Sequence, residues 1–83
     1  MPIQVVFYHT TDCHLCDLAE AMVTPLLTHY GLIAEAIDVA EDSDAFAAYG
    51  EQIPVLYFPA TNVAITWPFD PSDIAARFEL LAT

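Results

Sequence analysis

The 83-residue chain is long enough for one small domain, and its hydrophobic content of 57% is well above that of a disordered segment, so we expect a single folded domain over residues 1–83. Twelve acidic residues stand against one basic residue, Arg77, which gives a formal net charge of −11. Because phosphates are bound by clustered Lys and Arg, this charge excludes nucleic acid and disfavours membrane surfaces; it fits a neutral or basic partner, or serves only to keep an apolar protein soluble.

The N-terminal segment MPIQVVFYHT carries no basic residue, and its apolar run is too short for a membrane span or a convincing signal. We therefore expect a cytoplasmic protein. The two cysteines, Cys13 and Cys16, lie in the segment DCHLCD and are the only ones in the chain. In a reducing compartment such a pair is more often catalytic or metal-binding than a structural crosslink.

The first half of the chain predicts a strand, a long helix and a second strand. Residues 3–8 are apolar, β-branched and aromatic, as in a strand covered on both faces. Apolar residues then recur with helical spacing from Leu15 to Tyr30, and Gly31 marks the end of this helix. Pro25 lies off the apolar stripe, so we expect one bent helix. Residues 33–39 predict the second strand.

The second half predicts a short helix, a hairpin and a final helix. Residues 43–50 predict the short helix, with Asp42 or Ser43 as its N-cap and Gly50 just past its end. Strands are predicted over residues 55–58 and 63–67, and the last helix begins at Asp70, followed by a proline. The predicted order is βαβαββα, an α/β fold.

Three segments carry a resemblance to a known family. The segments are DCHLCD at the start of the first helix, AYGEQIPVL before the third strand, and WPFD after the fourth. Together with the element order they resemble the thioredoxin superfamily, and within it a small group of bacterial glutaredoxin-like proteins. The resemblance implies a thioredoxin-like α/β fold with a four-stranded mixed sheet and helices on both faces. It also implies a cis peptide bond before Pro54 that packs against the cysteines, and a backbone edge at Ile53 that receives a peptide or thiol.

The chemistry of the cysteine pair can be predicted from its place on the helix. A helix N-terminus offers free N–H groups and partial positive charge, which stabilise a thiolate at Cys13. Cys13 is therefore the expected nucleophile, and Cys16, one turn further on and deeper, the expected resolving thiol. His14 is a candidate helper that contributes a charge-assisted contact when it is protonated. Asp12 has two interpretations, as the helix N-cap and as a catalytic acid, and the first is at least as well supported as the second.

Two other functions remain open at this point. A Cys/His metal carrier would use Cys13 and Cys16 with His14 and His9, and zinc needs all four ligands to converge. His14 is expected to point outward from the first turn and His9 to lie at the surface, so no metal is expected. A non-catalytic thioredoxin-like module would instead bind a partner through its WPF surface. We favour a thiol-disulfide oxidoreductase, because a disulfide that closes so short a loop would stabilise the fold by only about 2 kcal/mol.

The expected substrate is a disulfide-containing protein or a small thiol, and the protein is expected to act as a monomer. Many glutaredoxins hold glutathione with a lysine before the CxxC motif and a Gly-Gly turn, and this chain has neither. Trp67 and Phe69 stand near that turn, where they either form an apolar substrate-binding surface or pack in the core. Glutathione is therefore a doubtful ligand, and no cofactor is expected.

Overall fold

The computed structural model describes residues 3–82 of the chain. Residues 1, 2 and 83, at the bounds of the expected domain, lie outside the described part. The elements follow the predicted order βαβαββα, with one short 3-10 helix added after the second strand. They are β1 Val5–His9, α1 His14–Tyr30, β2 Ala34–Asp38, η1 Val39–Glu41, α2 Ser43–Tyr49, β3 Val55–Phe58, β4 Val63–Thr66 and α3 Pro71–Ala82.

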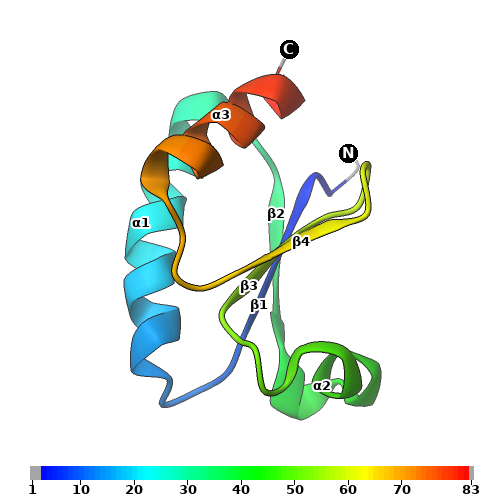
Figure 1. Cartoon of the computed structure of the whole chain (residues 1–83). Helices are drawn as coiled ribbons and strands as arrows, with labels where there is room; N and C mark the ends of the chain where they lie inside the picture. The colour runs from blue at the N-terminus through cyan, green and yellow to red at the C-terminus, as the bar shows by residue number, and fades with distance from the viewer. Residues whose placement is uncertain (1–2, 83) are drawn as a thin grey trace.

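The four strands form one mixed sheet in the order β2-β1-β3-β4. β1 runs parallel to β2, with Phe7 opposite Ala36, and antiparallel to β3, with Phe7 opposite Leu56. β3 and β4 pair as an antiparallel hairpin. In Figure 1, α1 and α3 cover one face of the sheet and α2 lies on the other. The expected α/β architecture, a four-stranded mixed sheet with helices on both faces, is confirmed.

Three strands differ from the prediction at their ends, and one of them is β2, which at Ala34–Asp38 is one residue shorter at each end than the predicted 33–39. β1 begins at Val5 and not at residue 3, although Gln4 is held beside the sheet by a 3.0 Å hydrogen bond from its N–H to the Ile33 carbonyl. β4 ends at Thr66, one residue earlier than predicted. Pro68 has no N–H with which to extend the ladder, so the chain leaves the sheet there.

The core lies between the sheet and the pair α1 and α3. Its fully or nearly buried members come from β1, β3, both of these helices and the segment between β4 and α3: Val5, Phe7, Ala19, Val23, Leu56, Phe58, Phe69, Ile74 and Phe78. The rings of Phe58 and Phe78 meet edge to face with centroids 6.1 Å apart. Burial of this apolar surface is the main stabilising contribution to so small a domain.

The helical stripe predicted for α1 is only partly buried. Val23 is 3% exposed, whereas Leu15 and Leu18, in the first turns, are each 45% exposed. α3 packs on the later turns of α1 and leaves the first turns uncovered on that side (Figure 1). Apolar side chains are therefore exposed on the part of α1 that follows the cysteines.

The helix ends follow from local chemistry. Gly31 ends α1 in the left-handed conformation at φ 65°, as expected for a glycine after the last turn. α1 continues through Pro25 as one helix, and the bend expected there remains a prediction. Asp42 caps α2 by accepting a hydrogen bond from the Ala45 N–H at 3.0 Å. Asp70 caps α3 by accepting one from the Ser72 N–H at 2.9 Å.

Gly50 follows α2 as predicted but does not adopt the left-handed conformation of a typical helix-ending glycine, since its φ is −54°. The requirement for glycine is steric, because an added Cβ would lie 2.6 Å from the carbonyl oxygen of Phe46. Across residues 3–82, no helix combines the length and apolar character that crossing a membrane requires.

Candidate redox site

Cys13 and Cys16 are joined by a disulfide bond at the start of α1, with Cα atoms 5.2 Å apart. Cys13 is partly exposed on the loop that leads from β1, whereas Cys16 lies inside the first turn of the helix and is only 3% exposed. A molecule that approaches from solvent therefore meets the sulfur of Cys13 first. This asymmetry is the one that the predicted roles of nucleophile and resolving thiol require.

The N-cap of α1 is Cys13 and not Asp12, which corrects the interpretation made from the sequence. The Cys16 N–H donates to the Cys13 Sγ at 3.1 Å, and the Asp17 N–H donates to the Cys13 carbonyl at 3.1 Å. Asp12 is exposed, with φ of 55°, a left-handed conformation that aspartate tolerates better than most residues. Asp12 thus forms the turn between strand and helix, and the sulfur occupies the capping position.

Charge around the disulfide has two opposing sources. The free N–H groups at the start of α1 favour negative charge at the Cys13 sulfur in the reduced protein. Asp12 and Asp17 are exposed carboxylates on either side of the pair and disfavour it. Arg77, the only Lys or Arg of the chain, lies on α3 and bonds to Asp73 at 3.3 Å.

A hydrogen bond that sequence reasoning missed anchors the loop before Cys13. The hydroxyl of Thr10 donates to Asp38 Oδ1 at 2.9 Å, and the Ala40 N–H donates to the same oxygen at 2.9 Å. The bond from the Ala40 N–H, then the bond from the Thr10 hydroxyl, and to a smaller extent the neighbouring His9, hold the pKa of the Asp38 carboxyl below its usual value. The feature that could have indicated this bond is the parallel pairing of β1 and β2, which places the ends of both strands at one edge of the sheet.

The peptide bond between Ile53 and Pro54 is cis in the structure, which is the isomer that the family resemblance implied. Pro54 is fully buried and Ile53 half-buried. The Trp67 N–H donates to the Pro54 carbonyl at 3.2 Å, which ties the end of β4 to the start of β3. The bond between Trp67 and Pro68 is also cis, and the sequence had given no reason to expect it.

An open groove of about 500 Å³ joins several of these segments. The first turn of α1, the loop between α2 and β3, and the end of β4 each contribute to it. Its lining residues are Leu15, Glu51, Gln52, Ile53, Thr66 and Trp67. The groove thus brings the predicted substrate-binding residues Ile53 and Trp67 together with the helix that carries the cysteines.

Phe69, the third residue predicted to bind substrate, lies elsewhere. It is 5% exposed and belongs to the core cluster with Ile74 and Phe78. Its ring meets that of Trp67 edge to face at a centroid distance of 5.3 Å. Core packing, the other interpretation considered for this residue, is therefore correct, and Phe69 contributes to the groove only by supporting Trp67.

The histidines are dispersed around the site. His14 is the first residue of α1 and is exposed to solvent. The ring of His9 stacks on Phe7 with centroids 5.6 Å apart. In the described part of the chain, no three His, Cys, Asp or Glu side chains are grouped so that they could hold a metal ion.

The loop that borders the groove is fixed by the packing of α2 on the sheet. The rings of Tyr8, on β1, and Tyr49, at the end of α2, lie 4.7 Å apart. Burial, with a smaller effect of the neighbouring Tyr49, raises the pKa of the Tyr8 hydroxyl. The Gln52 N–H donates to the Tyr49 carbonyl at 2.8 Å, and this bond ties the start of the loop to the end of α2.

Comparison with known proteins agrees with this geometry. A glutaredoxin-like domain family (DUF836) matches residues 4–79. The crystal structure of protein XcR50 from X. campestris is 27% identical, with a TM-score of 0.68 over 92% of this chain and 96% of that one. Protein Ne2328 from Nitrosomonas europaea is 23% identical, with a TM-score of 0.71 over 94% and 92%. Thioredoxin 1 from Thermosipho africanus is 14% identical, with a TM-score of 0.75 over 95% and 93%, which shows the fold alone.

A comparison with curated protein sequences gave no significant match. The family match, the thioredoxin fold and the Cys13–Cys16 disulfide at the start of α1 together support a redox-type role. The family match covers nearly the whole chain, and the chain belongs to the glutaredoxin-like domain family DUF836.

Proposed function

We propose that the protein is a thiol-disulfide oxidoreductase that reduces disulfides of a protein or small thiol with the Cys13 and Cys16 pair. The observation that carries this proposal is the arrangement of the pair at the start of α1. A partly exposed sulfur occupies the helix N-cap, and its partner lies buried one turn further on. That arrangement serves an exchange reaction better than it serves as a crosslink, because the loop that it closes is so short.

The reaction begins from the dithiol form. The Cys13 thiolate attacks one sulfur of the substrate disulfide, so that a Cys13–substrate disulfide forms and the other substrate sulfur leaves as a thiolate. The Cys16 thiolate then attacks the Cys13 sulfur and releases the second substrate thiol. The substrate gains two electrons and the protein ends as the Cys13–Cys16 disulfide, the form seen in the structure. A dithiol, or two monothiols, must reduce it again for turnover.

The groove gives the substrate a place at the first turn of α1, where Leu15, between the two cysteines, lines it. Ile53 is a partly exposed residue next to the buried Pro54, and Trp67 contributes an apolar side chain to the groove. His14 stays a candidate helper, since it adjoins Cys13 and is free to approach a developing thiolate from solvent.

Glutathione is a poor fit to this surface. The only Lys or Arg of the chain is Arg77, which lies on α3 and is paired with Asp73, so neither a lysine nor a free arginine is available to receive the glutathione carboxylates. A protein or peptide substrate of neutral or basic character fits better. We expect the reaction to take place in the cytoplasm and to involve the monomer.

The test is reduction of a model disulfide under single-turnover conditions, with the prereduced protein in excess. Wild type should reduce 2-hydroxyethyl disulfide or an insulin disulfide, and Cys13→Ser should lower the rate by about two orders of magnitude or more, because the exposed thiolate is lost. Glu79→Gln on the exposed face of α3 serves as the control and should match wild type. A Cys13→Ser rate equal to the wild-type rate would exclude the mechanism.

A non-catalytic binding module is the second candidate, and the half-buried Trp67 in an open groove is the observation that favours it. Under that function, a partner would bind equally well to wild type and to a variant with both cysteines replaced by serine. No disulfide would be reduced at a useful rate. The same single-turnover assay therefore separates the two candidates.

A further inference from the structure

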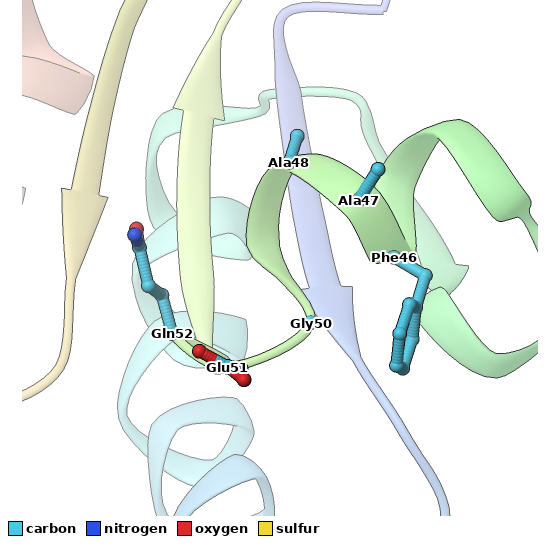
Figure 2. Close-up of a pocket in the computed structure, with 6 residues that line it drawn as sticks. All are labelled: Phe46, Ala47, Ala48, Gly50, Glu51 and Gln52. Atoms are coloured by element: carbon cyan, nitrogen blue, oxygen red, sulfur yellow. The ribbon is translucent and has the colours of Figure 1, made fainter.

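A second hollow adjoins the groove on the side of α2. Its volume is about 340 Å³. Figure 2 shows the residues that line it, which are Phe46, Ala47, Ala48, Gly50, Glu51 and Gln52. We refer to it as the α2 hollow. Glu51 and Gln52 line both this hollow and the groove beside the cysteines. The two hollows are therefore neighbours that share one wall, made of the loop between α2 and β3.

The α2 hollow has an apolar side chain available for contact. Phe46 is 58% exposed, which is a large fraction for an aromatic residue of a small domain. It lies against Gly50, where an added Cβ would come within 3.0 Å of its ring. The glycine thus allows the ring to lie close to the backbone where the helix ends.

The groove contributes a second apolar area at its other end. Leu15 is 45% exposed on the first turn of α1, and Trp67 is half-buried opposite the loop. Exposed apolar side chains therefore belong to both linings: Phe46 to the α2 hollow, and Leu15, which stands between the two disulfide-bonded cysteines, to the groove. A surface of this kind suits a ligand with more than one apolar contact.

The residues that line the groove and the α2 hollow carry only negative charge. Glu51 is the only ionisable residue among them, and it is exposed on the shared loop. The molecule as a whole has a formal net charge of −11. A cationic side chain at the shared loop would therefore be attracted both by the nearby carboxylate and by the field of the whole protein.

We propose that the groove and the α2 hollow form one docking surface for a polypeptide segment that contains the substrate cysteine, a basic residue and an apolar residue. This inference rests on the proposed oxidoreductase function and specifies its substrate class. The substrate disulfide lies at Cys13, the Lys or Arg pairs with Glu51, and the apolar side chain contacts Phe46. Glu51 is then the residue that determines the preference for basic substrates.

The experiment uses two peptides that each contain one disulfide and differ only in a Lys or a Glu near one cysteine. The prereduced protein is mixed with each peptide at physiological ionic strength, so that attraction beyond about 8 Å is screened while a direct contact with Glu51 remains. Oxidation can be followed by the fluorescence of Trp67, the single tryptophan, which lines the groove. The quantity compared is the ratio of the two rate constants.

We expect wild type to favour the Lys peptide and Glu51→Gln to lower the Lys-to-Glu ratio by about two- to fivefold, the range for an exposed ion pair. Glu79→Gln removes one charge as well, but from an exposed position of α3, and should keep the wild-type ratio. In Figure 1, α3 lies on the face of the sheet opposite α2. Phe46→Ser should slow both peptides relative to 2-hydroxyethyl disulfide. An unchanged ratio in Glu51→Gln, or an equal change in both Glu variants, would overturn the proposal.

A binding measurement that involves no disulfide exchange tests the docking proposal separately from the proposed function. In a variant with both cysteines replaced by serine, the reduced Lys peptide should bind more tightly than the Glu peptide, and Glu51→Gln should remove most of that difference. If peptides bind in this way but wild type reduces no disulfide, the docking surface stands and the oxidoreductase function fails. If disulfides are reduced but neither rate nor binding depends on Glu51, the docking proposal fails alone.

Discussion

At the residue scale, the site is set by a few backbone positions with strict local requirements. Cys13 takes the N-cap of α1 because Asp12 turns the chain in a left-handed conformation just before it. Gly31 ends the same helix with positive φ, whereas Gly50 is required because Phe46 lies too close for a side chain. The two glycines should therefore respond differently to the same substitutions.

We predict that Gly50→Ala lowers the free energy of unfolding by about 1–3 kcal/mol, because the new Cβ forces the end of α2 to shift. Asparagine should be no better than alanine there. At Gly31, where nothing surrounds an added Cβ but φ is 65°, alanine should cost about 1 kcal/mol and asparagine less. Urea unfolding of the four variants measures these differences, and an asparagine that rescues position 50 would contradict the steric explanation.

The bonds around Asp38 make a pH-dependent contribution to stability. Its folded-state pKa is lowered, first by the Ala40 N–H and then by the Thr10 hydroxyl, so the ionised form is favoured in the folded protein. That stabilisation is present above the unfolded pKa of about 3.9 and is lost as the pH falls through the lower folded value. The loop before Cys13 should loosen over the same range.

We therefore predict that wild type exceeds Asp38→Asn in stability at neutral pH and that the difference shrinks as the pH falls below about 4. Thr10→Val should remove part of the same contribution, while Asp44→Asn, at an exposed position of α2, serves as a control. Denaturant unfolding at a series of pH values measures the difference. A gap between wild type and Asp38→Asn that widens in acid would show that the sign is wrong.

Local chemistry could predict the roles of the cysteines and the cap at Asp70, and it narrowed the cap of α2 to Asp42 or Ser43, of which the structure has Asp42. The cis bond before Pro54 was implied only by the family resemblance. Local chemistry could not assign the N-cap of α1, because Asp12 and Cys13 are both able to cap and only the backbone conformation distinguishes them. The Thr10 bond to Asp38 depends on two strands that are distant in sequence, so local patterns did not reveal it.

At the scale of elements, every predicted strand and helix is present, because hydrophobic periodicity and turn residues are strong throughout the chain. What the periodicity could not show is which turns of α1 are covered. The apolar stripe predicts burial along the whole helix, but α3 packs only on its later turns (Figure 1). The exposed first turns are the ones beside the redox site.

This uneven coverage predicts a gradient of stability effects along α1. Leu15→Ser and Leu18→Ser should each cost less than about 1 kcal/mol, because both side chains are already 45% exposed. Val23→Ala should cost about 1–3 kcal/mol, and Phe78→Ala, on α3, about 3–5 kcal/mol, because both side chains are buried in the core. Thermal and denaturant unfolding test the order, and a large cost at Leu15 would place it in the core.

At the scale of the whole molecule, the net charge favours the approach of cationic substrates to the disulfide and opposes the approach of anionic ones. A net charge of −11 repels anions over about 8–10 Å at physiological salt, and it attracts cations over the same distance. The α2 hollow lies within this field, but its existence could not be predicted from sequence. It depends on how the loop after Gly50 lies between α2 and the sheet.

We predict opposite salt effects for two substrates. Raising the ionic strength should accelerate the reaction of the reduced protein with glutathione disulfide, which is anionic, and slow its reaction with a cationic disulfide peptide. Rates from low to high salt, with the neutral 2-hydroxyethyl disulfide as a control that should change little, measure both effects. Glutathione disulfide that reacts faster than the cationic peptide at low salt would reveal a glutathione site on this surface.

The central claim is that Cys13 is the nucleophile of a disulfide exchange and Cys16 the resolving thiol. Each single-thiol variant has one cysteine left, so the two can be compared directly for adduct formation with the same cationic disulfide peptide, by mass spectrometry at short times. Cys16→Ser should form a stable one-to-one mixed disulfide through Cys13, and Cys13→Ser should react at least about 100-fold more slowly, because Cys16 is 3% exposed. Equal rates in the two variants, or no adduct in Cys16→Ser, would contradict the account.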